Sequence, residues 1–490
     1  MTILLATQII LIIFVLVASG NTWRIASILF QLLSLAAAMY VINRGDSVPF
    51  KLTWVVIILI FPVFGGVLYM WSRISSLSLA RKLHILDSKS RRLFQPNEDV
   101  LHLVPEECVP QARYLQEYAG FPVYKDTYTK YLSPGEKFLE VLIPELERAE
   151  KYIFLEFFIV QNGKMWSSVL DVLKRKAAEG VDVRLIYDDV GCFWRLPKDY
   201  PAELRTYGIK CHVFNPFRPL LSAVQNNRDH RKIISIDGKV AFTGGVNLAD
   251  EYINEIELYG HWKDCGVMLK GEAAWSFTVI FLEMWHLLDN THDDIESMRP
   301  EKNSCPACTG GFAQPYSDSP MDSEHVGANV FLGIITRAKR YLYINTPYLI
   351  VNDSLLNALI LAAKSGTDVK IVMPHHADKP LVHATTRSYY RELLQGGVKI
   401  YEYTNGFLHS KTVVSDDVTA IIGTTNFDYR SLYLHFECGV VMFESSAVKE
   451  LYDDFTDMLP ACHEITDKDC RKNIFGGLWQ SVIRLFAPLM

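Results

Sequence analysis

Positive charge is not in surplus in this chain. The 490 residues contain 49 Lys and Arg against 55 Asp and Glu, which gives a formal net charge of −6. Proteins that bind nucleic acid across their surface usually show a basic excess. The composition argues against a general nucleic-acid-binding protein, so we expect no nucleic acid partner, although the composition does not exclude a local basic cleft.

Cysteine is scarce and irregularly spaced. The nine cysteines lack the spacing of a disulfide framework, which favours a reducing compartment. Cys305 and Cys308 form one C-x-x-C pair, but a tetrahedral zinc site needs a second pair of ligands, and none follows at a matching distance. We interpret residues 301–323, rich in Ser, Pro, Gly and Asp, as a linker, with a metal or redox role for the cysteine pair as the weaker alternative.

Long apolar runs are confined to the N-terminus. Hydrophobic residues make up 49% of the chain, and three stretches of them cover residues 3–19, 25–42 and 52–71. Each has about the length that a helix needs to cross a bilayer, roughly 17–25 residues. A cleaved signal peptide is the alternative for the first stretch, but it lacks a basic leading segment. The pattern predicts a transmembrane anchor of two to three helices over residues 1–72.

Charge then predicts the orientation of the chain. Basic residues dominate the start of the segment 73–125, where the only acid among them is Asp87; they are Arg73, Arg81, Lys82, Lys89, Arg91 and Arg92. Such a bias next to a membrane segment indicates the cytoplasmic side. It is also suited to binding anionic headgroups, and both interpretations stay open. At the other end, residues 466–490 fit an amphipathic helix that either lies in the membrane interface or docks on the preceding domain.

The remaining chain contains an internal repeat. Four segments recur in the same order: 151–160 with 340–350, 180–187 with 366–373, 208–215 with 397–404, and 264–267 with 437–440. We therefore expect a duplicated domain, with repeats over residues 126–300 and 324–465. Short β-branched and aromatic runs alternate with helical stretches in both, so each repeat is predicted to be an α/β unit with a mixed sheet flanked by helices.

Each repeat contains one copy of the motif His-x-Lys-x4-Asp. The candidate catalytic residues are His230, Lys232 and Asp237 in the first copy and His409, Lys411 and Asp416 in the second. Two residues apart on a strand, the histidine and the lysine project from the same face. An imidazole there can attack phosphorus or move a proton, while the lysine stabilises the developing negative charge. The pattern indicates phosphodiester transfer.

The aspartate of each motif stands seven residues after its histidine, so on a continuous strand its side chain would point to the face opposite that of the histidine and lysine. Asp237 is followed by Gly238, a pair typical of a hairpin turn. This favours a role in bracing the loop or the lysine over a contact with substrate.

Further polar residues recur at equivalent positions. Asn247 and Asn426 follow their motifs at the same offset, and their amides are suited to donating to phosphate oxygens. Asp264 and Glu437 stand at equivalent strand starts. A carboxylate there can accept the second ring N–H of a histidine and fix its tautomer; a surface salt bridge is the alternative.

These motifs, with the flanking stretches 247–252 (NLADEY), 261–266 (HWKDCG), 345–349 (NTPYL), 387–403 and 423–432 (GTTNFDYRSL), resemble the bacterial cardiolipin synthases of the phospholipase D superfamily. The likeness extends over most of the chain. The family commonly has Phe and Asn where Leu432 and His435 stand, and Ser-Gly-Pro at 314–316. These departures affect the expected pocket lining and headgroup preference, but not the two motifs.

The resemblance implies two phospholipase D-like repeats packed about a pseudo-twofold axis, with both motifs in one cleft. His230 would be the nucleophile that forms a phosphatidyl-histidine, and His409 the general acid and base. Phosphate would be bound by Lys232, Lys411, Asn247 and Asn426. An acid from the opposite repeat would orient each histidine, Glu437 for His230 and Asp264 for His409.

The implied reaction converts two phosphatidylglycerols into cardiolipin and glycerol. Its partners would be phosphatidylglycerol and other anionic phospholipids in the cell membrane, with the catalytic repeats on the cytoplasmic side and no metal or other cofactor. A phospholipase D-type hydrolase of lipid or nucleic acid, using water as acceptor, is the alternative, and a non-enzymatic membrane scaffold is a third. The acceptor preference, the number of spanning helices and the oligomeric state stay open.

Overall fold

A computed structural model describes residues 21–44, 48–61, 64–74, 94, 96–125, 127–217, 226–289, 293–301, 310–321, 324–470 and 474–487. The first apolar stretch (3–19), the basic residues between 81 and 92, and the pair Cys305 and Cys308 lie outside the described residues.

The N-terminal part consists of helices α2 (Asn21–Ile42), α3 (Val48–Ile60) and α4 (Phe64–Ile74). The prediction of one continuous helix over 52–71 is wrong, because α3 ends at Ile60 and α4 begins at Phe64. Pro62 accounts for the break, since proline lacks a backbone N–H and its ring clashes with the preceding turn. Across the described residues, no helix combines the length and the apolar character that crossing a membrane requires.

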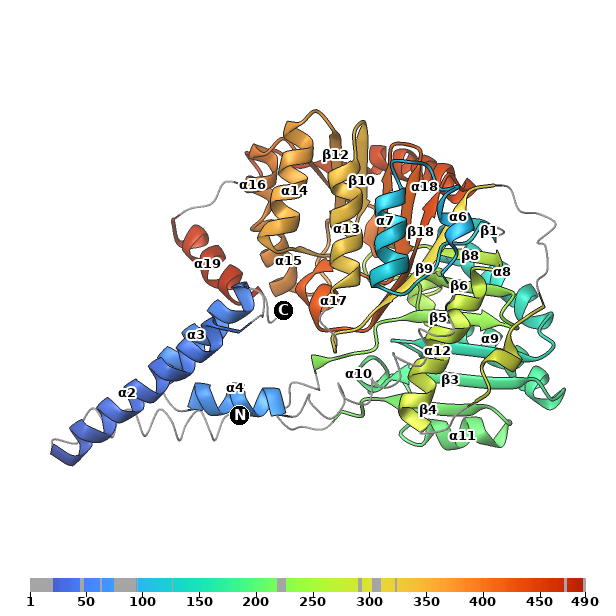
Figure 1. Ribbon diagram of the computed structural model, residues 1–490, viewed down its shortest axis with the longest axis horizontal. Coiled ribbons are helices and arrows are strands. Elements are labelled where there is room, and N and C mark those ends of the chain that lie inside the picture. Colours follow the sequence, from blue (N-terminus) through green and yellow to red (C-terminus); the bar gives the residue numbers. More distant parts are fainter. Residues whose placement is uncertain are drawn as a thin grey trace.

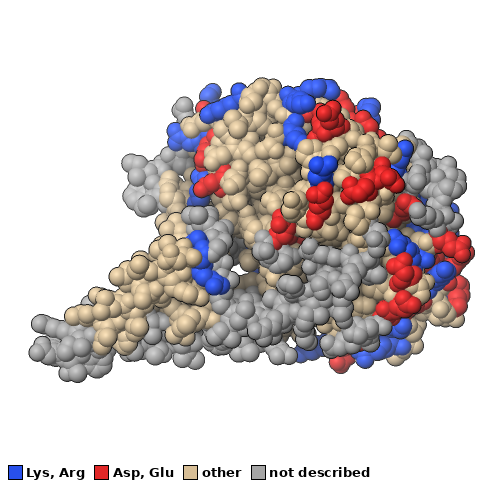
Figure 2. All heavy atoms as spheres, in the orientation of Figure 1, with Lys and Arg blue, Asp and Glu red and all other residues tan. Residues whose placement is uncertain are grey.

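The three helices bury only part of their apolar surface against one another. Val41, Trp54, Ile58 and Tyr69 form a small core between them. On the outer face of α2, large apolar side chains are more than half exposed; they include Leu29, Leu32, Leu33 and Met39. In Figure 1, α2 and α3 project away from the main body, and in Figure 2 they are almost free of charged side chains. Among the described residues, an extended apolar surface of α2 is exposed.

The main body contains a seven-stranded and an eight-stranded sheet, which share one strand order except for the additional edge strand β19 of the second. The first sheet runs β1 (Thr127–Leu132), β8 (Gly266–Gly271), β6 (Val240–Gly244), β5 (Lys232–Ile236), β2 (Tyr152–Phe157), β3 (Asp182–Asp188), β4 (Lys210–Phe214). The second runs β9 (Phe312–Asp318), β18 (Glu437–Phe443), β16 (Thr419–Gly423), β15 (Thr412–Ser415), β10 (Tyr341–Asn345), β12 (Asp368–Pro374), β13 (Lys399–Tyr403), β19 (Cys462–Glu464). Both sheets are mixed: β2, β3 and β4 are parallel, as are β10, β12 and β13. The predicted pair of mixed α/β repeats is confirmed.

Helices cover both sheets (Figure 1). The first repeat contains α8 (Gly135–Glu147), α9 (Lys164–Ala178), α10 (Asp189–Cys192), α11 (Tyr200–Thr206) and α12 (Ala274–Asp289); the second contains α13 (Val326–Arg337), α14 (Asp353–Lys364), α15 (Pro380–Arg387), α16 (Tyr390–Gln395), α17 (Tyr429–Tyr433) and α18 (Ser446–Met458). Short helices α6 (Glu98–Leu101) and α7 (Val109–Arg113) precede the first sheet. Helix α12 is buried almost throughout and contacts strands of both sheets, which explains why it is apolar on all sides.

Backbone pairing joins the two repeats at two related places. Strand β7 (His261–Lys263) of the first repeat pairs in parallel with β14 (Gly406–Leu408) of the second. A single parallel bridge joins Asp229 to Phe436. Each contact lies directly before a motif histidine, so the interface between the repeats determines where both histidines lie.

The C-terminal helix α19 (Ile474–Leu485) docks on the rest of the protein. Arg484 forms an ion pair of 2.8 Å with Glu392 and lies 4.2 Å from the ring centre of Tyr389. The Thr53 hydroxyl of α3 donates to the Leu485 carbonyl at 3.0 Å. Of the two interpretations for this segment, these contacts favour docking.

The motif aspartates lie at the far ends of the strands that begin beside the histidines. Asp237, in the left-handed conformation with φ 53°, accepts hydrogen bonds of 2.8 Å from the backbone N–H groups of Glu150, Lys151 and Tyr152. Asp416, with φ 59°, makes the same three contacts at 2.8–2.9 Å with Lys339, Arg340 and Tyr341. Each aspartate ties its hairpin to the start of the neighbouring strand, as the bracing interpretation predicts.

We expect Asp237→Ala to act on stability first. The substitution leaves three backbone donors without their acceptor and places alanine in a left-handed conformation, which together cost about 2–3 kcal/mol. The free energy of unfolding, measured by denaturant titration of the detergent-solubilised protein, checks this. Asp453→Ala, at an exposed ion pair with Lys449, is the control and should change little. Full stability with lost activity would instead place Asp237 in the chemistry.

Candidate active site

The interface between the repeats brings each histidine to a carboxylate of the other repeat. The backbone N–H of His230 donates to the Phe436 carbonyl at 3.0 Å, and the backbone N–H of His409 donates to the Lys263 carbonyl at 2.8 Å. Phe436 and Lys263 are the residues directly before Glu437 and Asp264. This backbone pairing therefore places the His230 imidazole next to the Glu437 carboxylate and the His409 imidazole next to that of Asp264.

The side chains then form two crossed histidine–carboxylate pairs. Nδ1 of His230 lies 2.9 and 3.0 Å from the two carboxylate oxygens of Glu437, and Nδ1 of His409 lies 2.7 Å from Oδ2 of Asp264. A ring nitrogen and a carboxylate oxygen approach this closely only with a proton between them. When that proton is on Nδ1 of a neutral ring, the Nε2 lone pair of the histidine is available for chemistry.

The surroundings of His409 are aromatic. The rings of Tyr252 and Trp262 pack against it with centroids 5.4 and 5.3 Å away. Burial, followed by the charge of Lys411, lowers the pKa of His409 to about 4. Burial acts to raise the pKa of Asp264, but His409 and Lys411 outweigh it and hold that pKa below its ordinary value. His409 is therefore neutral in the free site, and Asp264 is an anion.

The surroundings of His230 are more polar. Phe158 and His435 flank the ring with centroids at 5.1 and 5.7 Å. Burial, and next the charge of Lys232, lowers the pKa of His230 well below its ordinary value. Burial also raises the pKa of Glu437, whose carboxylate accepts a hydrogen bond from the Thr424 hydroxyl. His230 is thus kept neutral in the free site.

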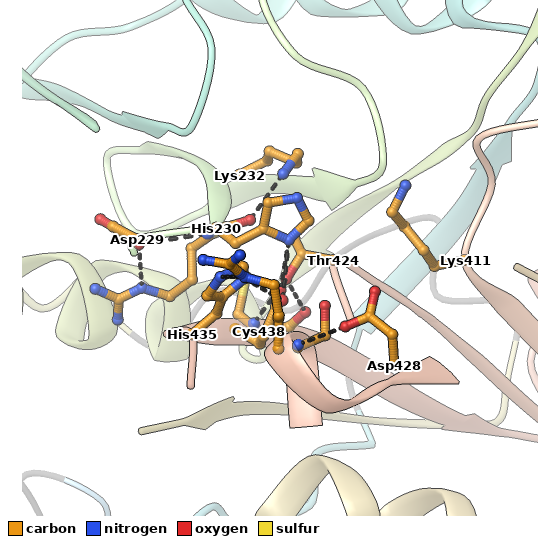
Figure 3. A network of polar contacts seen from close by, with 12 residues as sticks. Asp229, His230, Lys232, Lys411, Thr424, Asp428, His435 and Cys438 are labelled. Atoms are coloured by element: carbon orange, nitrogen blue, oxygen red, sulfur yellow. Dashed lines mark hydrogen bonds and ion pairs between the residues drawn. The ribbon is translucent and has the colours of Figure 1, made fainter. Parts of the chain in front are cut away.

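Two buried lysines complete the cleft. Lys232 donates to the His230 carbonyl at 2.7 Å, and Lys411 donates to the His409 carbonyl. Burial lowers the pKa of Lys232 to about 8 and that of Lys411 to about 7. In Figure 3 the two amino groups approach the His230 ring from different sides. An anion between them would favour their protonated forms.

The two asparagines support the cleft from within the fold. Oδ1 of Asn247 accepts from the Ile159 N–H at 3.0 Å, and its Nδ2 donates to the Tyr252 hydroxyl at 2.7 Å. Because Tyr252 packs on His409, Asn247 helps to position that ring and has one N–H left for a ligand. Asn426 is also buried, and its Oδ1 has no hydrogen-bond partner among the described residues.

Equivalent positions in the repeats differ beside the carboxylates. A Cβ added to Gly245 would lie 2.1 Å from Oδ1 of Asp264, so glycine is required for the carboxylate to fit. The equivalent residue in the second repeat is Thr424, which donates to Glu437. Asp264 instead accepts from the Cys265 N–H at 2.8 Å. The two pairs are alike in geometry but differ in their support.

Sequence reasoning missed the charged residues that hold the segment before His230. Arg228 pairs with Asp188 at 2.9 Å, and Arg231 pairs with Asp229 at 3.1 Å. All four side chains are buried. The sequence does not indicate that these ion pairs are buried, because the segment enters the interface only through the pairing of Asp229 with Phe436 of the second repeat.

One group of side chains among the described residues has the geometry for a metal ion. The ligand atoms of His230, His435 and Glu437 lie within 4.8 Å of one another. His230 and Glu437 are already paired, and Arg430 and Lys232 are among the cations that lower the pKa of His435. This positive environment disfavours a divalent cation and suits an anion.

Comparisons with known proteins agree with this geometry. The family model described as "Cardiolipin synthase, PLD-like domain" matches residues 142–285 and 331–459, and the "Phospholipase_D-nuclease N-terminal" model matches residues 32–72. An uncharacterized protein of Streptococcus mutans is 40% identical, covering 93% of this chain and 100% of its own length. Cardiolipin synthase 2 of Bacillus anthracis is 34% identical, covering 93% of this chain and 89% of its own.

A solved structure supports the fold alone. Phosphatidylserine synthase of Haemophilus influenzae superposes with a TM-score of 0.59 at 14% identity, covering 78% of this chain and 98% of that one. The family models and the curated relatives establish the family as well as the fold, because together they cover both motif-bearing repeats and most of the chain. The chain therefore belongs to the cardiolipin synthase family with phospholipase D-like domains, and it is a phosphatidyltransferase.

Proposed function

We propose that this protein transfers a phosphatidyl group from one phosphatidylglycerol to another, giving cardiolipin and glycerol. The observation that carries the proposal is the pair of crossed histidine–carboxylate contacts beside two buried lysines in one cleft. Two available imidazole nitrogens and two fixed cations suit a two-step displacement at phosphorus, in which one histidine attacks and the other moves protons.

In the first step, Nε2 of His230 bonds to phosphorus and the bond from phosphorus to the glycerol oxygen breaks. His409 supplies the proton that the departing oxygen needs. Although His409 is neutral in the free site, the bound phosphodiester adds negative charge, which favours the imidazolium. In the second step, His409 removes a proton from the incoming hydroxyl, the new oxygen–phosphorus bond forms, and the His230–phosphorus bond breaks.

The lysines stabilise the charge that develops on the phosphoryl oxygens, and Asn247 and Asn426 support this part of the cleft. Asp264 and Glu437 hold the tautomers of His409 and His230 through both steps. We assign Asp237 and Asp416 to bracing the hairpins.

The proposal places this chemistry at a membrane. Substrates and product have two or more acyl chains, so they stay in the bilayer. Residues 1–72 would form the multi-pass anchor, with the repeats on the cytoplasmic side. The exposed apolar side chains of α2 support an attachment to lipid, as does the sequence of α2 and α3, in which Arg24 and Lys51 are the only charged residues.

The product analysis tests the reaction. Purified protein mixed with phosphatidylglycerol vesicles should release glycerol and form cardiolipin in equal amounts, because each transfer frees one headgroup. Thin-layer separation of the lipids and an enzymatic glycerol assay measure both. Phosphatidic acid in place of cardiolipin would mean that water is the acceptor and the protein is a hydrolase.

The two histidines should differ in a trapping experiment. With phosphatidylglycerol labelled in its phosphate, acid-labile label should collect on His230, and His409→Ala should slow turnover about 10²–10⁴-fold by removing the general acid and base. His230→Ala should abolish labelling while leaving the protein folded by circular dichroism. Label found on His409 in the His230→Ala protein would reverse the two roles.

The pH dependence should be governed by the lysines on the alkaline side. Both must be protonated to stabilise a phosphate, and the pKa values of Lys411 and Lys232 are lowered to about 7 and about 8. We therefore expect kcat/KM to fall as pH rises through this range. Lys411→Arg, whose guanidinium stays charged, should remove the first part of the fall. An unchanged profile in this variant would show that Lys411 does not titrate there.

A further inference from the structure

A second cationic group lies next to the transfer site, on the second repeat. Nε of Arg430 donates to Nε2 of His435 at 3.4 Å, and the His435 ring lies 5.7 Å from that of His230. In Figure 3, His435 lies on the other side of His230 from Lys411. A cation is therefore held one side chain away from the proposed nucleophile, outside the pair of motif lysines.

Arg430 has no acidic partner of its own. Across the part of the chain that the structure describes, no carboxylate lies within ion-pairing distance of its guanidinium. The acid that acts to raise the pKa of Arg430, Asp428, is the N-cap of α17 and accepts a hydrogen bond from the Ser431 N–H at 2.8 Å. Arg430 is only partly exposed, and a partly buried guanidinium without a counter-ion is unfavourable unless a ligand supplies the charge.

Lys379 extends this group. Strand β11 (Leu349–Ile350) pairs in parallel with β17 (Phe427–Asp428), which sets Tyr348 next to the segment that bears Arg430. Nζ of Lys379 lies 3.3 Å from the Tyr348 hydroxyl and 4.9 Å from its ring centre. Burial first, and then the charges of Arg430 and Lys379, lower the pKa of His435, so both cations act on the same imidazole, and Arg430 also contacts it.

The first repeat is built differently at the same positions. Four residues after its asparagine stands Glu251, which is buried and ion-paired with Arg195 at 2.8 Å, whereas Arg430 follows Asn426 at the same offset. Two residues before its carboxylate stands Trp262, where the second repeat has His435. At the compared positions of the described residues, the first repeat thus has Glu251 where the second has Arg430, so this cation does not follow from the fold itself.

We propose that Arg430 and Lys379, with Arg430 held by His435, form a second anion subsite that binds the phosphodiester of the acceptor lipid. The proposal rests on the function given above. In a phosphatidylglycerol acceptor, three carbons separate the reacting hydroxyl from the molecule's own phosphate, so that phosphate must lie one headgroup away from the phosphorus on His230. A guanidinium is suited to it because it can donate two parallel hydrogen bonds to phosphate oxygens.

The subsite would select the acceptor class. Water and free alcohols carry no phosphate and gain nothing from Arg430, whereas a phospholipid alcohol gains a charge-assisted contact. Arg430 and Lys379 would therefore favour transfer to phospholipid over hydrolysis or exchange, without taking part in the attack of His230 on the donor.

A partition experiment tests this. Protein in phosphatidylglycerol vesicles is supplied with isotope-labelled glycerol, and two products are measured in one reaction: cardiolipin, whose acceptor has a phosphate, and labelled phosphatidylglycerol, whose acceptor has none. Both products arise from one donor step, so their ratio reports on the acceptor alone. We expect Arg430→Gln to lower the ratio about ten- to a hundredfold while labelled phosphatidylglycerol still forms.

The variants keep each outcome interpretable. Lys379 is exposed, so Lys379→Gln should fold and lower the ratio in the same direction; Arg430→Lys should restore part of it. Arg340→Gln, at an exposed ion pair beside Asp416, is the matched control and should leave the ratio unchanged. If Arg430→Gln and Lys379→Gln leave the ratio at the wild-type value, with both products falling together or not at all, the subsite is overturned. Wild-type protein that forms no cardiolipin would instead refute the proposed function before any variant is compared.

Discussion

The site depends on the backbone pairing between the repeats, which places a carboxylate of one repeat under a histidine of the other. Neither repeat contains a complete pair: His230 needs Glu437, and His409 needs Asp264. The backbone N–H groups of the two histidines donate to the carbonyls of Phe436 and Lys263, and these hydrogen bonds fix the position of each histidine against the other repeat. A displacement of one repeat against the other would break both pairs together, so the active site and the domain interface are the same structural feature.

Burial gives this arrangement its chemical character. The two histidines, two lysines and two acids are all buried, and in such surroundings charge is unfavourable unless it is balanced. Burial therefore keeps the histidines neutral and lowers the pKa of both lysines, so their charged forms are disfavoured until an anion binds between them. An anion bound between Lys232 and Lys411 would restore their ordinary preference for the charged form.

Much of the fold and of the candidate site could be predicted from the sequence, because the motif and the segments around it occur twice. Two equal motifs at matching positions of a duplication predicted the two α/β repeats and the parity of the histidine and lysine. The N-terminal helices were less readable: length and apolar character predicted one helix over 52–71, and a single proline divides it into α3 and α4. The ion pairs of Arg228 and Arg231, and the contact of Arg430 with His435, depend on segments far apart in the chain or on local geometry, and no periodicity indicates them.

The two halves of the site have equivalent backbones, but the side chains around His409 differ in chemical character from those around His230. Around His409 the neighbours are the rings of Tyr252 and Trp262, and its polar partners are the Asp264 anion and the Lys411 amino group. Around His230 the carboxylate is longer, is held by Thr424, and lies beside His435. A proton carrier benefits from a fixed anion that stabilises its imidazolium, whereas a nucleophile must stay neutral until it attacks. The side-chain differences thus support the proposed division of roles, which the symmetric backbone alone does not decide.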